Sequence, residues 1–256
     1  MSHETIEFAV SEGVATLTLN RPQVMNALSS RMRAEITDAV TTLPPEARCL
    51  VITGAGRGFC SGQDLTDRAA AADLEGTLRD EYEPMLRAIR ACRAPVIAAV
   101  NGVAAGAGAN LALAADVVIA AESASFIQAF ARIGLVPDAG GTFVIPRAVG
   151  MARAMGMMLF AEPVSARQAA DWGLIWKAVD DADLMAEAET LARSLAAGPT
   201  LGLGLTKRLI QQAATHTLDQ QLDAERDAQQ QAGSSADYAE GVTAFLEKRP
   251  ARFSGQ

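Results

Sequence analysis

The chain is short of the residues that several common enzyme classes require. It has two histidines, His3 and His216, and no GxSxG turn, so a Ser-His-Asp triad or a Cys-His pair lacks its parts. The three cysteines, Cys49, Cys60 and Cys92, stand at wide spacings without a CxxC pair. This pattern argues against a disulfide framework and against a zinc site, so we expect no bound metal.

Positive charge is also scarce, with 22 Lys and Arg against 30 Asp and Glu and a net charge of −8. Such a balance argues against broad binding of nucleic acid or of an anionic membrane. The start of the chain has no basic segment followed by an apolar one, so we expect no secretion signal and a cytoplasmic location. Residues 94–121 are apolar, but Asn101, Asn110 and Asp116 interrupt them, which predicts buried strands and a helix rather than a membrane span.

The first half of the chain has the pattern of a largely parallel α/β protein. Residues 14–20 alternate faces as a half-buried strand does, and they predict a hairpin with 6–12. Residues 29–43 carry apolar side chains at helical spacing, and 75–92 predict a further helix with an awkward Pro84. Short apolar runs between the helices predict buried parallel strands over 49–54, 95–100 and 116–121.

After about residue 145 the pattern becomes helical, because runs of β-branched residues almost vanish. Ser165 with Gln168, and Ser234 with Asp237, stand at the spacing of helix-capping pairs. Residues 175–179 interrupt the helices and predict an edge strand. No long linker separates the halves, so we expect one core domain and one C-terminal helical subdomain, over 1–195 and 196–256.

Three glycine-rich loops, 54–65, 101–111 and 134–142, follow apolar strands or precede helices. Such loops can point backbone N–H groups into a pocket, but they also serve simply to turn the chain. Within the third loop, Asp138 stands among apolar residues and glycines, and as a residue type it suits either a helix cap or a catalytic base. Cys60 is expected to be a small buried filler, since no histidine near it in sequence could activate it.

At these loops the sequence resembles the crotonase superfamily, the enoyl-CoA hydratases and isomerases. The resemblance implies an α/β spiral of ββα units with a C-terminal helical trimerisation region, assembled as a homotrimer or as a hexamer of two trimers. It also implies an acyl-CoA thioester substrate and no separate cofactor, because coenzyme A is part of the substrate. The segments that carry it, in the family's order, are LTLNRPQVMNALSS, GRGFCSGQDL, NGVAAGAGANLALAADVVIA, GLVPDAGGT and FLEKR.

The resemblance also assigns roles to individual positions. The backbone N–H groups of Gln63 and Ala107 would form an oxyanion hole for the thioester oxygen, where each donor contributes about 3 kcal/mol. Lys248 would meet the phosphates of coenzyme A, reaching them across a subunit interface. The positions implied to line the coenzyme A moiety are Ser61, Gln63, Asp64 and Leu65.

The chain departs from the hydratases that it resembles at two positions. The resemblance implies that hydratases carry water-activating glutamates there, whereas this chain has Asn110 and Phe130. An amide cannot act as a general base and a phenyl ring excludes water, so efficient hydration is not expected. The isomerase branch places one acid in the third loop, where this chain has Asp138, and an apolar pocket would raise its pKa towards neutrality.

Further segments resemble isomerases that act on the ring 1,2-epoxide of phenylacetyl-CoA in phenylacetate degradation and form an oxepin-CoA. We therefore expect an acyl-CoA isomerase of this kind, with Asp138 as its base. The alternatives are a Δ3,Δ2-enoyl-CoA isomerase or hydratase of fatty-acid oxidation, and a noncatalytic acyl-CoA-binding protein. The side chains that could line an acyl pocket are equally expected as plain core: Phe126, Phe130, Met155, Met158 and the stretch 66–82.

Overall fold

The computed structural model describes residues 3–256, and its larger sheet has six strands in the order β1-β2-β3-β5-β7-β10. The first two strands form the predicted antiparallel hairpin, and the others run parallel. Strand β10 ends the sheet beside β7, as an edge strand. The strands are β1 (Ile6–Ser11), β2 (Val14–Leu19), β3 (Cys49–Gly54), β5 (Val96–Val100), β7 (Val117–Ala121) and β10 (Lys177–Val179).

A second, smaller sheet was not predicted from the sequence. Its strands, in the order β4-β6-β8-β9, are two or three residues long, too short to show a period of alternating faces. Two of them lie inside segments that looked like plain glycine-rich loops. The strands are β4 (Gly58–Cys60), β6 (Val103–Ala105), β8 (Ser125–Ile127) and β9 (Val164–Ser165).

The chain alternates between the two sheets. Three times in succession it adds a strand to the larger sheet and the next to the smaller one, as β3 and β4, β5 and β6, and β7 and β8. Helices connect these pairs, including α4 (Glu83–Ala91) and α5 (Ala107–Leu113). This is the α/β spiral of ββα units that the sequence predicted.

The helical run before β5 explains how the chain accommodates Pro84. It comprises α2 (Arg68–Ala72), α3 (Leu74–Thr77), the π-helix η2 (Leu78–Tyr82) and α4. Pro84 falls in the first turn of α4, immediately after the wider π turn. Helix α1 (Ser30–Thr41), capped by Ser29, packs against α4.

The core lies between and beneath the sheets. Helix α9 (Leu184–Ala196) lies against β2, β3, β5 and β7, and it buries Leu184, Ala188, Ala192 and Ala196, which recur every fourth residue. Helix α5 is buried along its whole length and contacts strands of both sheets. The start of α5 is therefore held rigidly, and this position matters for the site.

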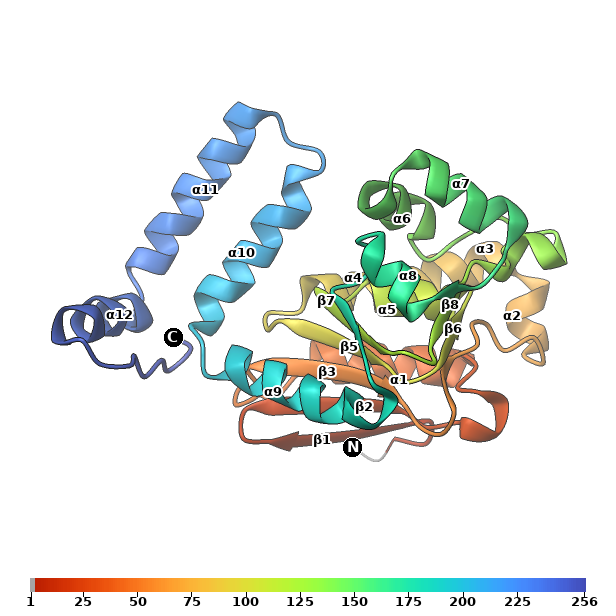
Figure 1. Cartoon of the computed structure of the whole chain (residues 1–256), viewed down its shortest axis with the longest axis horizontal. Helices are drawn as coiled ribbons and strands as arrows, with labels where there is room; N and C mark the ends of the chain where they lie inside the picture. The colour runs from red at the N-terminus through yellow and green to blue at the C-terminus, as the bar shows by residue number, and fades with distance from the viewer. Residues whose placement is uncertain (1–2) are drawn as a thin grey trace.

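The remaining helices follow β8 and β9, and Figure 1 shows that α10 to α12 extend beyond the sheets at one end of the molecule. Arg48 ties them to the core, since its Nε donates to the Thr200 hydroxyl at 2.9 Å and its Nη1 to the Phe253 carbonyl at 2.9 Å. These helices are η3 (Ala129–Ile133), α6 (Gly141–Val149), α7 (Met151–Phe160), α8 (Ala166–Asp171), η4 (Asp181–Asp183), α10 (Thr200–Ala213), α11 (Leu218–Gly233) and α12 (Ala236–Glu247), while the short η1 (Pro22–Val24) precedes α1.

One predicted cap was wrong by a residue. The Oγ of Ser235, rather than that of Ser234, accepts from the backbone N–H of Tyr238 at 3.0 Å and caps α12. Ser234 instead ends α11, so the two helices share no residue. Within residues 3–256, no helix combines the length and the apolar character needed to cross a bilayer.

Candidate active site

Two neighbouring strands of the smaller sheet bring Gln63 and Ala107 together. Strands β4 and β6 are parallel, and Cys60 pairs with Ala104. Gln63 and Ala107 each stand three residues beyond this pair, so both follow the carboxyl ends of adjacent strands. A Cβ added to Gly62 would lie 3.5 Å from the backbone nitrogen of Ala107, which places the two loops in contact.

The backbone N–H groups of Gln63 and Ala107 donate to no acceptor among the residues that the structure describes. Ala107 is the first residue of α5, where an N–H has no partner within the helix. Around Gln63 the neighbouring groups are used instead: the N–H of Leu28 donates to Gly62 at 2.8 Å, and the N–H of Asp64 donates to Leu28 at 3.2 Å. Both N–H groups are thus left without a partner among the described residues.

Glycine is required where these loops turn. Gly62 has a φ of +91°, and a Cβ there would stand 2.8 Å from the carbonyl oxygen of Ala105. Gly106 has a φ of +53°, and its N–H donates to the carbonyl of Ile127 at 2.7 Å, which joins the start of α5 to β8. The positions of the two donors therefore depend on backbone conformations that other residues adopt only with strain.

The third loop follows β8 and adds Phe130 and Asp138. Phe130 is buried in η3, and its ring atoms would lie 3.7 Å from a Cβ on Gly106, so an apolar wall stands beside the start of α5. Asp138 lies between η3 and α6. Its Oδ1 atom is buried and has no hydrogen-bond partner among the described residues. Burial raises the pKa of this carboxyl from 3.8 to about 6.

Asp138 does not cap α6. Gly140 occupies the N-cap position, and no side chain there accepts from the helix. Of the two roles that suited Asp138 as a residue type, capping of α6 is thus excluded, and a half-buried carboxylate remains whose Oδ1 has no partner among the described residues. Such a group titrates closer to neutral pH than an ordinary aspartate and can both take and return a proton.

Asn110 takes part in a buried polar network. Its Nδ2 donates to the backbone carbonyl of Asp138 at 2.8 Å, and its Oδ1 accepts from the Nε2 of Gln128 at 2.9 Å. Asn110 and Gln128 are both buried. Sequence reasoning missed Gln128, which had no motif to mark it because a single glutamine in an apolar stretch carries no spacing signal.

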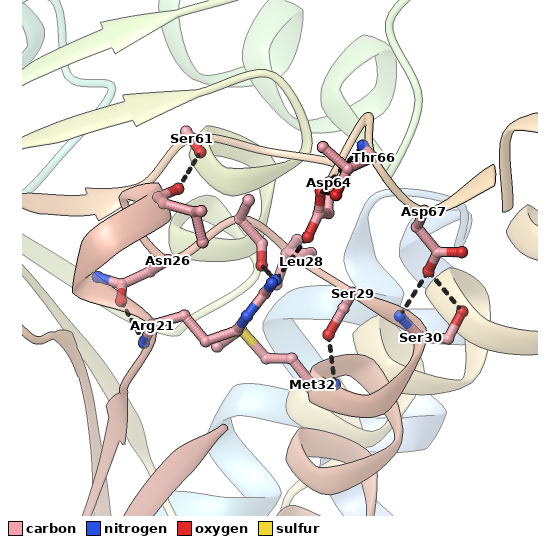
Figure 2. Close-up of polar contacts among 12 residues, drawn as sticks. Arg21, Asn26, Leu28, Ser29, Ser30, Met32, Ser61, Asp64, Thr66 and Asp67 are labelled. Carbon is pink, nitrogen blue, oxygen red and sulfur yellow. Dashed lines mark hydrogen bonds and ion pairs between the residues drawn. The ribbon is translucent and has the colours of Figure 1, made fainter. Parts of the chain in front are cut away.

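The segment from Ser61 to Leu65 forms a surface turn that internal bonds hold in place (Figure 2). The Asp64 carboxylate accepts from Arg21 at 2.8 Å and from the Thr66 hydroxyl at 2.6 Å. The bond from Thr66, and after it that from Arg21, lowers the pKa of Asp64. Ser61 and Leu65 are exposed, whereas the side chain of Asp64 is committed within the protein.

Arg21 and Asn26 support this turn and were not singled out from the sequence, although both lie in the segment LTLNRPQVMNALSS. Asn26 is buried with a φ of +56°, and its Nδ2 donates to the carbonyls of Gly58 at 2.9 Å and Phe59 at 3.1 Å. Its Oδ1 accepts from the N–H of Arg21 at 2.9 Å (Figure 2). The pair thus fixes β4, from whose end the Gln63 turn begins.

Several other residues lie apart from this site. Lys248 is an exposed residue at the end of α12, at the opposite end of the molecule from α2 in Figure 1. The ring of His3 meets that of Phe8 edge to face, and His216, in the turn after α10, contacts Gln221. Cys60 is fully buried, and burial raises the pKa of its thiol to about 12, so it is not an activated nucleophile.

A cavity of about 380 Å³ lies behind the third loop. Asn110, Ala139, Gly140 and Gly141 border it, but Asp138, Gln63 and Phe130 do not. Among the side chains considered for an acyl pocket, Phe126 is fully buried in the core and Met155 is exposed on α7. Residues 3–256 contain no cluster of three or more His, Cys, Asp or Glu that could hold a metal ion.

Comparison with known proteins identifies the family. The model of the enoyl-CoA hydratase/isomerase family matches residues 9–256, nearly the whole chain. The chain belongs to the enoyl-CoA hydratase/isomerase family. It is therefore an enzyme of the crotonase fold, as the five ordered motifs predicted.

Two relatives of known description within the enoyl-CoA hydratase/isomerase family carry different names. The chain is 57% identical, over the full length of both, to a protein of Rhodobacter capsulatus named "Probable enoyl-CoA hydratase". It is 52% identical to the 1,2-epoxyphenylacetyl-CoA isomerase of Escherichia coli, covering 96% of this chain and 97% of the other. The family is thus established, while its hydratase and isomerase branches are both represented among similar proteins.

Solved structures of the family support the same fold. A crystal structure described as an enoyl-CoA hydratase from Streptomyces coelicolor superposes with a TM-score of 0.94 at 38% identity, covering 100% of this chain and 96% of the other. An enoyl-CoA hydratase/isomerase structure from Mycobacterium abscessus gives a TM-score of 0.92 at 37% identity, covering 98% and 100%. The spiral and the C-terminal helices are therefore features that this chain shares with its family.

Proposed function

We propose that this enoyl-CoA hydratase/isomerase family member is a CoA-thioester isomerase that converts the ring 1,2-epoxide of phenylacetyl-CoA to an oxepin-CoA. The observation that carries the proposal is Asp138, whose buried Oδ1 has no partner and whose pKa burial raises to about 6. The 52% identity to an enzyme of that name supports the substrate. Epoxide and oxepin are isomers, so the reaction consumes neither water nor a co-reactant.

In the proposed mechanism the thioester oxygen accepts hydrogen bonds from the N–H groups of Gln63 and Ala107. Asp138 takes a proton from the carbon next to the thioester carbonyl, and the enolate charge develops on the oxygen that these donors hold. Each such donor lowers the barrier by about 3 kcal/mol. The bond between the two epoxide carbons breaks as the six-membered ring expands to the seven-membered oxepin. Asp138 returns its proton to a ring carbon, which completes the isomerisation and regenerates the carboxylate.

The surroundings of Asp138 suit proton transfer better than hydration. Phe130 places an apolar ring beside the start of α5, and the amide of Asn110 is engaged by Asp138 and Gln128. Neither side chain can remove a proton from water. An enolate formed in such a place is protected from side reactions with solvent.

The proposal extends to how the substrate is held. Exposed Ser61 and Leu65 on the turn, with the backbone of Gln63, would contact the coenzyme A moiety, while Asp64 would fix the shape of the turn. Lys248 would meet phosphates of coenzyme A bound to another subunit, which requires a homotrimer or a hexamer of two trimers. Coenzyme A is part of the substrate, and the proposed reaction uses no separate cofactor.

A substrate panel tests the proposal. Wild-type enzyme and Asp138→Asn are assayed side by side on the phenylacetyl-CoA epoxide, a 3-enoyl-CoA and crotonyl-CoA. We expect wild type to turn over the epoxide fastest and Asp138→Asn to lose that activity while still binding the thioester in calorimetry. Rapid hydration of crotonyl-CoA would favour the hydratase branch, to which the Rhodobacter relative's name points. Binding without any turnover would favour a noncatalytic acyl-CoA-binding protein.

A further inference from the structure

The loop that carries Asp138 is weakly held by packing. A Cβ added to Gly134 or to Gly140 would meet no atom within 4 Å, and Val136 is largely exposed. The cavity of about 380 Å³ lies behind Ala139 and Gly140, so the loop has free space on that side too. Ala139 has a φ of +49°, a conformation that costs a residue with a side chain of order 1 kcal/mol. Packing alone does not explain why the loop stays in this position.

Hydrogen bonds to the Asp138 carbonyl supply the missing restraint. That oxygen accepts from the N–H of Gly141 at 2.9 Å, within the turn itself, and from the Nδ2 of Asn110 at 2.8 Å. The second bond joins the loop to α5, which is buried along its whole length and held between the sheets. It therefore ties a loosely packed loop to one of the most rigid parts of the molecule.

Gln128 fixes the direction in which Asn110 points. A backbone carbonyl can only accept, so Asn110 must turn its Nδ2 towards Asp138 and its Oδ1 away. The Oδ1 then accepts from Gln128 Nε2 at 2.9 Å, and Gln128 Oε1 lies 3.4 Å from Asn110 Nδ2. Gln128 is fully buried, so no water competes for this amide pair.

We infer that Asn110 and Gln128 are positioning residues, which act through the Asp138 backbone to hold the carboxylate in its buried, unpartnered position. The inference rests on the proposed function, in which Asp138 is the base. It gives Asn110 a specific task at a position where hydratases carry a glutamate. An ionised carboxylate has no proton to donate, so it could not form this bond to the Asp138 carbonyl.

The charged and ionisable side chains on the elements around the loop could also change the pKa of Asp138. Tyr82 on η2 is an ionisable neighbour, and its phenol is neutral because burial, its main influence, raises its pKa. The basic side chains on adjacent elements make other contacts or line the cavity. Arg132 on η3 donates to Ala161, Arg147 on α6 donates to Phe143, Arg87 on α4 pairs with Glu83, and Arg90 borders the cavity.

Two substitutions test the inference, Asn110→Leu and Gln128→Met, which retain size and remove the amides. Gln128→Met removes the partner that orients Asn110 while leaving Asn110 itself beside Asp138. Misplacing a catalytic group by about 1 Å can cost on the order of 100-fold in rate, so we expect kcat to fall about 10- to 100-fold, with KM changed less than about threefold. The apparent pKa of the kcat/KM profile should fall from near 6 towards 3.8 as the carboxylate relaxes into solvent.

Gln221→Met is the matched control, because Gln221 on α11 donates its amide to the Leu209 carbonyl on α10, away from the loop. It should leave kcat and the pH profile unchanged. ¹³C NMR titration of the Asp138 carboxyl, assigned by its loss in Asp138→Asn, reports the same shift without any turnover. It also serves for a variant too weak to assay.

The outcomes separate this inference from the proposed function. If Asp138→Asn abolishes isomerisation but both amide variants keep the wild-type kcat, pH profile and Asp138 titration, the positioning role is wrong and the base assignment stands. If the amide variants lose only thermal stability, with an unchanged pH profile, their role is structural and the inference is again overturned. If Asp138→Asn itself stays active, the proposed function fails first.

Discussion

The side-chain amide of Asn110 and the backbone carbonyl of Asp138 lie 2.8 Å apart, although 28 residues separate them in the chain. This bond links Asn110, at one of the two positions where the resemblance gives hydratases a glutamate, to the loop that carries the proposed base. In the proposed function the donor at position 110 and the acid at position 138 work together, since one holds the loop on which the other stands.

The pH dependence of the reaction should follow the ionisation of Asp138. The base must be deprotonated to accept a proton, and burial raises its pKa to about 6. We expect kcat/KM to rise with pH through about 6 and then to level off. Steady-state assays between pH 4.5 and 8 check this, and a profile that is flat across that range would contradict the assignment.

Asp138→Asn should stabilise the protein at alkaline pH. The pKa of Asp138 in the folded state, about 6, lies above the ordinary 3.8, so the folded state favours the protonated form. The stabilisation is complete below the unfolded pKa and is lost as the pH rises through the folded one. An ionised Asp138 therefore lowers the free energy of unfolding by about 3 kcal/mol at pH 8, a loss that an amide avoids.

Urea unfolding of wild type and Asp138→Asn at pH 8 and pH 4 measures this difference. The variant should be more stable at pH 8, and the two proteins should converge at pH 4. A variant that is less stable than wild type at both values would show that Asp138 makes favourable contacts when it is ionised.

Gly62→Ala should impair the proposed oxyanion hole. A Cβ at Gly62 would stand 2.8 Å from the Ala105 carbonyl, at a φ of +91°, so the Gln63 turn must move. Since losing one oxyanion donor lowers kcat by about 100- to 1,000-fold, we expect a loss of that size. Gly156→Ala is the control: it lies in α7 with no atom within 4 Å of an added Cβ. This variant should keep full activity, and its free energy of unfolding should rise by about 0.5 to 1 kcal/mol.

Arg21→Met should destabilise the turn that carries Gln63. The Arg21 guanidinium donates to the Asp64 carboxylate at 2.8 Å and to the Ala27 carbonyl at 2.7 Å, and Asp64 is buried. Removing one partner of a buried ion pair lowers the free energy of unfolding by about 3 to 5 kcal/mol. We expect a loss near the lower end, because Thr66 still donates two hydrogen bonds to the Asp64 carboxylate.

The control for Arg21→Met is Arg193→Met, whose exposed side chain pairs with Glu189 and Glu12 on the surface. Such pairs contribute less than about 1 kcal/mol, so the control should unfold almost as wild type does. Equal losses for both variants, measured by urea unfolding at pH 7, would show that the Arg21–Asp64 pair does not support the turn.

The sequence allowed the larger sheet to be predicted strand by strand, because buried parallel strands such as 49–54 and 116–121 are continuous apolar runs bounded by glycine or aspartate. The smaller sheet could not be predicted in this way. A strand such as Gly58–Cys60 has three residues, and its pairing with Val103–Ala105 depends on tertiary structure. The cap of α12 was assigned to Ser234 instead of Ser235 because the two serines are adjacent and either side chain could cap a helix.

The candidate site was predicted unevenly for a similar reason. Its isolated place among glycines and apolar residues marked Asp138, whereas Gln63 and Ala107 were assigned by the resemblance to the family. Gln128 and Arg21 act through long-range contacts with Asn110 and Asp64, and no local pattern reveals such pairs. Whether Asp138 caps a helix or stands free likewise depended on where α6 begins, at Gly141.

Exchange of the α-proton of phenylacetyl-CoA with D₂O, followed by NMR, measures the step that Asp138 is proposed to catalyse. This thioester has the acidic carbon but no epoxide, so the measurement isolates proton removal from the rest of the isomerisation. If Asp138 is the base, wild-type enzyme catalyses the exchange with an apparent pKa near 6, and Asp138→Asn binds the thioester without exchanging its proton. Exchange by Asp138→Asn at the wild-type rate would contradict the assignment of Asp138 as the base.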